Sequence, residues 1–351
     1  MPKNRFSKIS SIIKDAKKGK MFILVDDKNR ENEGDLIIPG SKCNSKNINF
    51  MAKHGRGLIC LALTKKQVDN LGLPLMSSIN KSRMQTAFTV SIEAKKGITT
   101  GISAQDRAKT IKTAINSKVK KSEIVSPGHV FPLVARNGGV LERAGHTEAS
   151  VDISKLSNLN PSSVICEVMN EDGRMARLND LFKFSKKHKI KLASIEDLIS
   201  YRLKYEKLIK RLTSKSLIVK KIGKLNIYNY KNKLENNINF VITKGVLNQK
   251  KSIPVRVLSN SIQNKNIINN NSIKKSLKMM AKFKSFLLLV INNRNSINKE
   301  SSINTLRYYG IGAQIIKDLN VKNMILISRS KKKIIGLEGF GLKIKKQIIV
   351  K

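Results

Sequence analysis

Short apolar runs separated by polar stretches predict alternating helices and strands over the first 208 residues. Residues 7–19 place apolar side chains every three or four positions, which predicts an amphipathic helix. The runs 22–25 and 57–63 have the length of buried strands. By the same criteria, further helices are expected at 47–54, 104–115, 177–188 and 195–208, and further strands at 36–39, 88–92, 130–134 and 164–169.

The composition changes near residue 208. Beyond residue 211 the acids are limited to Glu235, Glu300, Asp318 and Glu338. Strand-like segments continue there, but residues 262–278 are rich in Asn, Lys and Ile, which predicts a loop. We therefore predict two domains, residues 1–208 with an α+β fold and residues 209–351.

The formal net charge of +45 on 351 residues suggests a nucleic-acid partner, because Lys and Arg neutralise phosphates. However, lysine is spread along the whole chain together with abundant Asn, Ile and Ser, and no RNA- or DNA-binding motif accompanies it. This pattern favours a general drift in composition over a nucleic-acid site. A positive field would in either case attract a small anionic substrate.

The cysteines and apolar runs indicate a cytoplasmic protein. Cys43, Cys60 and Cys166 lack the CxxC spacing of a zinc site and do not form a disulfide framework, so a reducing compartment is expected. The first residues lack the apolar segment of a signal peptide. The longest apolar run, 286–291, is too short to cross a membrane.

Residues 26–35 carry the densest group of acids in the chain, directly after the apolar run 21–25. Its five carboxylates belong to Asp26, Asp27, Glu31, Glu33 and Asp35, with Arg30 among them. Carboxylates packed this closely repel one another unless a cation compensates their charge. Oxygen ligands on a short loop suit Mg²⁺, so this segment predicts a divalent-metal site at the end of a strand.

Two of the four histidines stand in glycine-rich contexts typical of functional loops. His129 lies in Ser-Pro-Gly-His, and His146 lies in Arg-Ala-Gly-His-Thr. Arg143, His146 and Thr147 offer a guanidinium, an imidazole and a hydroxyl within five residues, a set that suits a phosphate beside a metal. We interpret the other two histidines, His54 and His188, as structural.

The segments 26–35, 97–103, 127–129 and 143–147 together resemble 3,4-dihydroxy-2-butanone-4-phosphate synthase of riboflavin biosynthesis, and the likeness covers essentially all of 5–205. The resemblance implies a mixed-sheet α+β domain and a carbon–carbon lyase. It also implies conversion of D-ribulose 5-phosphate to 3,4-dihydroxy-2-butanone 4-phosphate and formate through Mg²⁺- or Mn²⁺-dependent enediolate chemistry. A homodimer with active sites near the subunit interface is expected.

The resemblance assigns roles to individual residues. Glu31 and His146 are expected to bind the metal. The expected substrate-binding residues are Arg30, Glu31, Asp35, Arg143, Ala144, Gly145, His146 and Thr147. His129, Glu167 and Asp35 are the expected catalytic residues, because several proton transfers require more than one titrating group. Asp35 or Glu167 would carry protons, with His129 as a partner.

Other residues keep two interpretations. Cys60 either approaches the substrate or is a buried structural thiol, the interpretation that we favour. Glu33 belongs either to the metal surroundings or to a solvated loop. Thr99, Thr100 and Ser103 either contact a phosphate or form a turn and a helix cap.

The last part of the chain resembles a second family. Residues 306–315 and 336–342 are similar to the closing segments of GTP cyclohydrolase II, which implies a smaller α/β domain. That enzyme holds zinc on three cysteines, one of them in Arg-Val-His-Ser-Glu-Cys. Here the segment reads Arg-Val-Leu-Ser-Asn-Ser over residues 256–261, and no cysteine follows Cys166. We expect a degenerate domain without zinc or GTP cyclohydrolase activity, which serves stability, dimer contacts or regulation. The rival hypothesis is binding of GTP or RNA without turnover.

Overall fold

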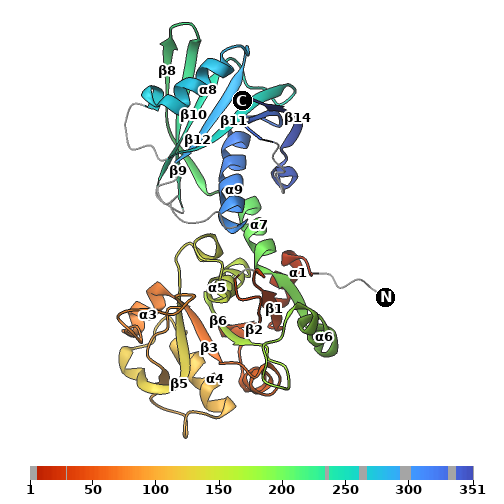
Figure 1. Cartoon of the computed structure of the whole chain (residues 1–351). Helices are drawn as coiled ribbons and strands as arrows, with labels where there is room; N and C mark the ends of the chain where they lie inside the picture. The colour runs from red at the N-terminus through yellow and green to blue at the C-terminus, as the bar shows by residue number, and fades with distance from the viewer. Residues whose placement is uncertain are drawn as a thin grey trace. The chain divides into compact units, whose positions relative to one another are not determined.

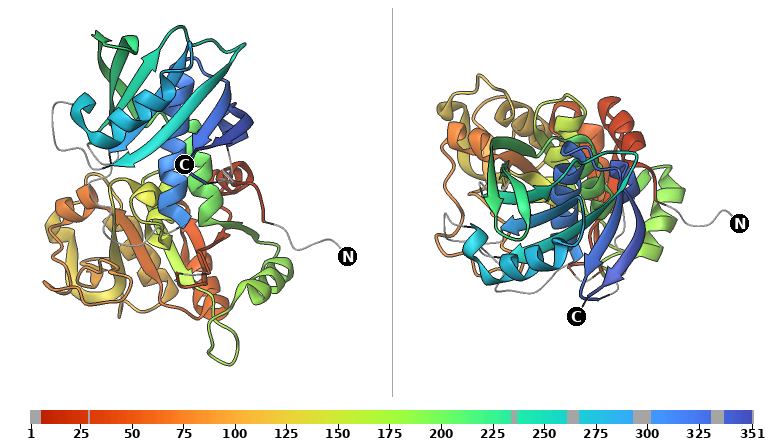
Figure 2. Two further views of the ribbon diagram at one scale, coloured as in Figure 1. Left: turned by 45° about the horizontal axis from the view of Figure 1, so that its top comes forward. Right: turned by 90° about the horizontal axis from the view of Figure 1, so that it is seen from above.

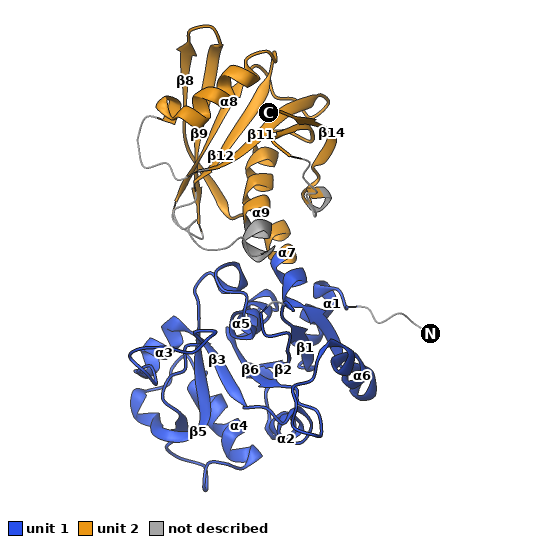
Figure 3. Cartoon of the chain, viewed as in Figure 1, with its two compact units in different colours: residues 1–199 blue, residues 200–351 orange. Residues whose placement is uncertain are grey.

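The chain forms two compact units, residues 1–199 and 200–351 (Figures 1 and 3). The computed structural model describes residues 6–28, 30–233, 237–260, 267–292, 302–330 and 337–350, with only the backbone for residues 260, 302–307, 338 and 339. The two units divide inside helix α7 (Ile195–Tyr205), nine residues before the boundary predicted at 208.

The first unit contains a seven-stranded mixed sheet in the order β4-β5-β3-β6-β2-β1-β7. Its strands are β1 (Phe22–Val25), β2 (Gly34–Pro39), β3 (Cys60–Thr64), β4 (Ile92–Ala94), β5 (Ile124–Ala135), β6 (Ser162–Glu167) and β7 (Lys191–Ser194). Its helices are α1 (Ile9–Lys17), α2 (Ser45–Phe50), α3 (Lys65–Leu71), α4 (Ala104–Ala114), α5 (His146–Leu156), α6 (Leu178–His188) and the start of α7. The predicted mixed-sheet fold is confirmed.

Local sequence signals explain where several helices begin and end. The Thr64 hydroxyl accepts a hydrogen bond from the backbone N–H of Gln67 and caps α3. The Ser103 hydroxyl does the same for Asp106 at the start of α4. Each cap satisfies a backbone donor that has no partner within the helix. Helix α3 ends at Gly72, which adopts the left-handed conformation that glycine tolerates.

The two faces of the first sheet have different roles. Alternate strand residues such as Leu36, Leu61 and Val164 point into the main apolar core. Residues of the opposite parity face α5, where Ala62 packs against Val151 of that helix. Because side chains alternate along a strand, the face that is covered by α5 also carries the side chains of Asp35 and Glu167 at one end of the sheet.

Two local predictions, a strand and a loop, are wrong. The strand expected at 88–92 is reduced to isolated bridges at Phe88 and Thr89, and the regular strand starts at Ile92. The helix expected at 47–54 is confirmed, as α2 followed directly by a π-helical turn, residues 51–55. The loop expected at 262–278 contains helix α8 (Asn271–Met280), capped by Asn270, while residues 262–266 lie outside the described part.

The second unit has a seven-stranded mixed sheet in the order β14-β13-β11-β12-β10-β9-β8. Its strands are β8 (Ile209–Val219), β9 (Gly223–Asn232), β10 (Ile238–Lys244), β11 (Ser252–Asn260), β12 (Phe286–Asn292), β13 (Asn323–Ser328) and β14 (Lys343–Ile349). Helices α8 and α9 (Ser302–Asp318) cover opposite faces of this sheet and form two apolar cores (Figure 2). Among the described residues, none of the helices is both long and apolar enough to span a membrane.

Candidate active site

The loop between β1 and β2 folds around the carboxylate of Asp26. This side chain accepts hydrogen bonds from the backbone N–H groups of Glu31 (3.1 Å) and Glu33 (2.9 Å). The guanidinium of Arg30 donates to the same carboxylate at 2.7 Å and also contacts Glu31. The dense acidic segment is therefore an ordered turn, because its first acid binds the backbone of the others.

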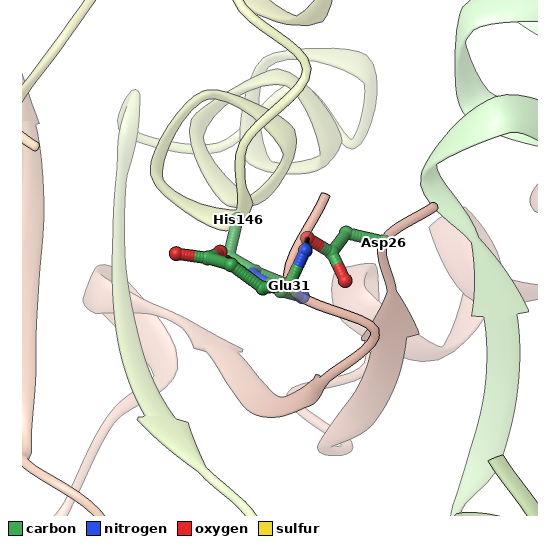
Figure 4. A group of neighbouring side chains, drawn as sticks. All are labelled: Asp26, Glu31 and His146. Carbon is green, nitrogen blue, oxygen red and sulfur yellow. Dashed lines mark hydrogen bonds and ion pairs between the residues drawn. The ribbon is translucent and has the colours of Figure 1, made fainter. Parts of the chain in front are cut away.

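Three side chains of this region form a group with the geometry of a cation site. Asp26 and Glu31 lie on the loop after β1, and His146 is the first residue of α5 (Figure 4). One potential ligand atom from each residue lies within 4.8 Å of the others. The Nδ1 atom of His146 is 3.9 Å from an oxygen of Glu31 and 3.6 Å from Oδ1 of Asp35. The structure thus brings together Glu31 and His146, the two predicted metal ligands.

Asp35 and Glu167 lie directly opposite each other in the antiparallel pair formed by β2 and β6. Residues paired in this way share a face of the sheet, so the two carboxylates are close neighbours. The backbone N–H of Leu58 donates a hydrogen bond of 2.8 Å to Oε2 of Glu167. Gly57 makes room for this contact, because a Cβ atom there would lie 2.5 Å from the same oxygen.

Burial and crowding change the titration of the site. Burial raises the pKa of the Asp35 carboxyl well above its usual value, and the negative charges of Glu167 and Glu31 add to this effect. Burial also raises the pKa of Glu167, although the hydrogen bond from Leu58 opposes it. Burial lowers the pKa of His146 to about 4, so its imidazole is neutral at pH 7. Neutral imidazole is the form of histidine that binds metals.

The residues at this sheet edge fit a divalent cation. Nε2 of His146 and Oδ1 of Asp35 are both buried without a hydrogen-bond partner, although buried polar atoms are nearly always satisfied. These two atoms lie in a group of four carboxylates and one neutral imidazole, which belong to Asp26, Glu31, Asp35, Glu167 and His146. Arg30 pairs with two of the carboxylates, those of Asp26 and Glu31. Oxygen-rich ligand sets of this kind suit Mg²⁺ or Mn²⁺.

The predicted phosphate-binding segment lies next to the cluster, but its arginine is engaged elsewhere. Arg143 pairs with Glu148 at 2.7 Å and donates to the backbone carbonyl of Met84 and the hydroxyl of Thr86. Ala144 and Thr147 are buried. Gly145 precedes α5, and a Cβ atom there would lie 2.3 Å from the Arg143 guanidinium.

His129 lies at the same end of the sheet as Glu167 but is not part of the acidic cluster. Phe131 of β5 pairs with Cys60 of β3, which in turn pairs with Ile165 of β6. The start of β3 therefore separates His129 from Glu167. The imidazole of His129 instead contacts the carboxylate of Glu93 on β4.

The structure places the residues that kept two interpretations. Cys60 is 2 % exposed, and its pKa is raised well above the usual value by burial and then by Glu167 and Asp35. Glu33 is half-buried and pairs with Arg177 at 3.5 Å. The hydroxyl and the N–H of Thr99 both bond Asp106, which orders the turn before α4.

Sequence reasoning missed three features of the site. Asp26 is one of the predicted acids, and its position directly after a strand is the signal that it organises the loop. The Leu58 N–H contact and the Glu93 contact join segments that are distant in sequence. The local pattern therefore contains no signal for either contact.

Comparison with known proteins identifies the family of the first unit. The sequence model of 3,4-dihydroxy-2-butanone 4-phosphate synthase matches residues 10–201. The chain belongs to the 3,4-dihydroxy-2-butanone 4-phosphate synthase family. The model of GTP cyclohydrolase II matches residues 210–349, so the resemblance of the second unit is also confirmed.

Relatives share both the synthase region and the second unit. A riboflavin biosynthesis protein RibBA from Aquifex aeolicus is 43% identical over 99% of this chain and 93% of its own length. A 3,4-dihydroxy-2-butanone 4-phosphate synthase from Photobacterium phosphoreum is 42% identical over 96% of this chain and 98% of its own length.

Solved structures of this synthase family are also similar. RibBX from A. baumannii, a two-domain synthase, is 36% identical with a TM-score of 0.81, over 98% of this chain and 99% of its own. A synthase solved in complex with two magnesium ions is 38% identical with a TM-score of 0.55, over 57% of this chain and 99% of its own.

Strand β11 of the second unit includes residues 256–260 of the segment that was compared with GTP cyclohydrolase II. Leu258 on β11 stands where the resembled segment has histidine, and Ser261 lies outside the described residues. Within the described ranges, the three-residue group suited to a metal is the one in the first unit.

Proposed function

We propose that this protein converts D-ribulose 5-phosphate to 3,4-dihydroxy-2-butanone 4-phosphate and formate in riboflavin biosynthesis, and that the reaction requires Mg²⁺ or Mn²⁺. The observation that carries the proposal is the group formed by Asp26, Glu31 and His146 beside the paired carboxylates of Asp35 and Glu167. Membership of the synthase family and the magnesium-bound relative support it.

The reaction needs metal and proton chemistry but no external oxidant, because the atoms of the five-carbon sugar phosphate are fully accounted for in the four-carbon product and formate. Glu31 and His146 would hold the cation, and Asp26 is close enough to contribute. A bound divalent cation supplies a Lewis acid that polarises the ketone and stabilises negative charge on its oxygens.

The chain's own residues would handle the protons. A base must remove a proton beside the ketone, and an acid must protonate the terminal hydroxyl as it leaves. Asp35 and Glu167 suit these roles, because a carboxyl with a raised pKa carries a proton closer to neutral pH than an ordinary one does. His129 is the proposed partner in these transfers, and Arg30 with residues 143–147 would bind the sugar phosphate.

The test is the release of formate from ribulose 5-phosphate by the full chain with Mg²⁺. We expect turnover that stops with EDTA and returns when Mg²⁺ or Mn²⁺ is added. The exposed acid Asp69, paired with Lys65 on α3, offers a matched control, because Asp69→Asn removes a carboxylate away from the site. Absence of formate under all metal conditions would contradict the proposal.

For the second unit we propose no GTP cyclohydrolase activity, because the zinc-binding cysteines are absent from the sequence. The test uses the full chain carrying Glu31→Gln, so that formate from ribulose 5-phosphate cannot interfere. Formate released from GTP with Zn²⁺ would contradict the proposal. A GTP titration at two salt concentrations tests the rival hypothesis of binding without turnover, since phosphate-driven binding weakens steeply with salt.

A further inference from the structure

Strand β5 leaves its partner strand just before His129. Ile92 of β4 pairs with Val130, but the next residue, Glu93, pairs with Val125. The four residues 126–129 of β5 therefore have no partner in β4, because they fall between the pairings of two consecutive β4 residues, Ile92 and Glu93. A bulge of this kind redirects a side chain, and such bulges are common beside active sites.

The redirected side chain meets a carboxylate. Nδ1 of His129 contacts Oε1 of Glu93, across the bulge. The His129 side chain is 45% exposed, whereas that of Glu93 is 17% exposed. Glu93 is therefore held mostly inside the protein, and His129 extends from it toward solvent.

The surroundings leave Glu93 little freedom. A Cβ atom on Gly101, whose φ is +87°, would lie 1.7 Å from Oε1 of Glu93, so the carboxylate packs directly on this backbone. The N–H of Gly101 is bonded to Asp106, which fixes the turn. A Cβ atom on Gly128 would lie 2.4 Å from Cγ of Glu93. The Glu93 side chain thus packs against two glycine-containing segments.

We infer that Glu93 is a positioning residue that holds the His129 imidazole in one orientation and one tautomer for proton transfer. The inference rests on the proposed function, because it assumes that His129 takes part in the reaction. It goes beyond the resemblance, which assigns no role to Glu93.

The chemistry follows from the hydrogen bond. If Nδ1–H donates to Glu93, the lone pair of the neutral ring is on Nε2, which is then the atom that accepts a proton. When Nε2 accepts that proton, the ring becomes an imidazolium, and the Glu93 carboxylate stabilises its positive charge. The proton returns from Nε2 to the reaction in a later transfer, so the dyad is unchanged after each turnover. Carboxylates orient histidines in this way in other enzymes.

The first test is kinetic and uses Glu93→Gln in the full chain. Glutamine keeps the size of the side chain but loses the charge and can rotate its amide. We expect kcat to fall about 10- to 100-fold while KM changes less than about 3-fold, because loss of the positioning carboxylate removes part of the roughly 100- to 10,000-fold that a general base contributes in the transition state. Glu123→Gln is the matched control, since Glu123 also adjoins β5 but caps the backbone of Lys120 instead.

The second test does not require turnover. Nitrogen-15 NMR of the imidazoles distinguishes Nδ1–H from Nε2–H, and the His129 signal is assigned by its loss in His129→Gln. We expect Nδ1–H in the unsubstituted protein and a smaller Nδ1–H population in Glu93→Gln. A spectrum that shows Nε2–H, or one that is identical in both proteins, would overturn the inference.

The two tests separate the failures. If the protein releases no formate, the proposed function fails, while the NMR experiment still decides whether Glu93 fixes the tautomer. If formate is released and kcat of Glu93→Gln stays within about 2-fold of the unsubstituted value, Glu93 is not a positioning residue. Circular dichroism and the thermal transition show whether Glu93→Gln remains folded, and Glu123→Gln provides the reference for both.

Discussion

Each unit contains its own seven-stranded mixed sheet, but the two sheets differ in the charged side chains that they carry. In the first unit, Asp35 and Glu167 face each other on neighbouring strands, and Glu31 and Asp26 lie beside them. In the second unit, β11 has Leu258 at the position where the resembled segment has histidine. The sheet of the first unit thus carries a group of mutually repelling acids, whereas β11 in the second unit carries the apolar side chain of Leu258.

The difference teaches where function constrains this chain. Buried like charges cost stability, and a protein retains them where a bound cation or a reaction needs them. The first unit keeps these acids in a chain that carries 69 basic and only 24 acidic residues in total. The second unit has apolar cores on both faces of its sheet, which stabilise its fold.

The largest expected effect is that of Glu31→Gln. Glutamine retains the shape but removes one charge from the proposed metal ligands. Formate release from ribulose 5-phosphate should fall to about one thousandth or less, on the scale of losing a group that stabilises transition-state charge. The thermal transition should remain cooperative. If Glu31→Gln were as active as the control Asp69→Asn, Glu31 would be no more important for turnover than an exposed surface acid, and its assignment as a metal ligand would be wrong.

Gly57→Ala should have the next largest effect. The new Cβ atom would lie 2.5 Å from Oε2 and 2.6 Å from the backbone oxygen of Glu167. Displacing this carboxylate should lower kcat by about 10- to 100-fold, since small misplacements of reacting groups are costly. Overpacking should also lower the free energy of unfolding by about 1–3 kcal/mol.

Gly312→Ala in α9 provides the comparison for Gly57→Ala in the second unit. There the added Cβ atom meets terminal methyl groups of Leu289 and Ile291 at 3.3 and 3.4 Å. Kinetics and thermal unfolding of both variants should show an activity loss for Gly57→Ala alone. Equal losses in the two variants would mean that the Gly57 effect is general destabilisation.

Asp35→Asn should stabilise the metal-free protein at neutral pH. The pKa of Asp35 is raised in the folded state, so the folded protein binds more protons than the unfolded chain between pH 3.8 and that raised value. Stability is therefore lost as the pH rises through this window, and the variant avoids the loss. His146, whose pKa is lowered from 6.5 to about 4, makes the folded state less stable as the pH falls through that range. Both proteins keep His146, so its contribution is the same in each.

Thermal unfolding in EDTA at pH 5 and pH 8 measures this effect. We expect the Tm of Asp35→Asn to exceed that of the unsubstituted protein, and the difference to be larger at pH 8 than at pH 5. Each kcal/mol gained in the free energy of unfolding should raise Tm by roughly 2–4 °C. Mg²⁺ should narrow the gap, because a ligand that binds the folded state stabilises the protein that retains its charges. A variant less stable than the unsubstituted protein at pH 8 in EDTA would contradict the assignment.

Local patterns predict much of the first unit but little of the contacts that complete its site. The apolar periodicity is a local signal, and α1 and β1 appear where it predicts them. The pairing of Asp35 with Glu167 depends on the register of β2 and β6, which no single segment encodes. Composition also misleads at residues 271–280, where apolar side chains at helical spacing form α8 within an Asn- and Lys-rich stretch.

The smallest expected effect concerns a polar group inside the second unit. Tyr230 is fully buried, and its hydroxyl donates to Asp318 at 2.6 Å while accepting from Arg211 at 3.0 Å. Tyr230→Phe should lower the free energy of unfolding by about 1–2 kcal/mol, because the hydroxyl bonds charged groups. Formate release should be unchanged, since this network is distant in sequence from the synthase residues.

Tyr228→Phe is the matched control for Tyr230→Phe. Tyr228 is partly exposed, and the Arg211 guanidinium lies 5.3 Å from its ring, a contact that phenylalanine retains. Urea unfolding should therefore show a smaller loss for Tyr228→Phe than for Tyr230→Phe. A fall in kcat for Tyr230→Phe at temperatures where the protein stays folded would show that the second unit supports turnover. That result would overturn the contrast between a first unit that carries out the reaction and a second unit that contributes only stability.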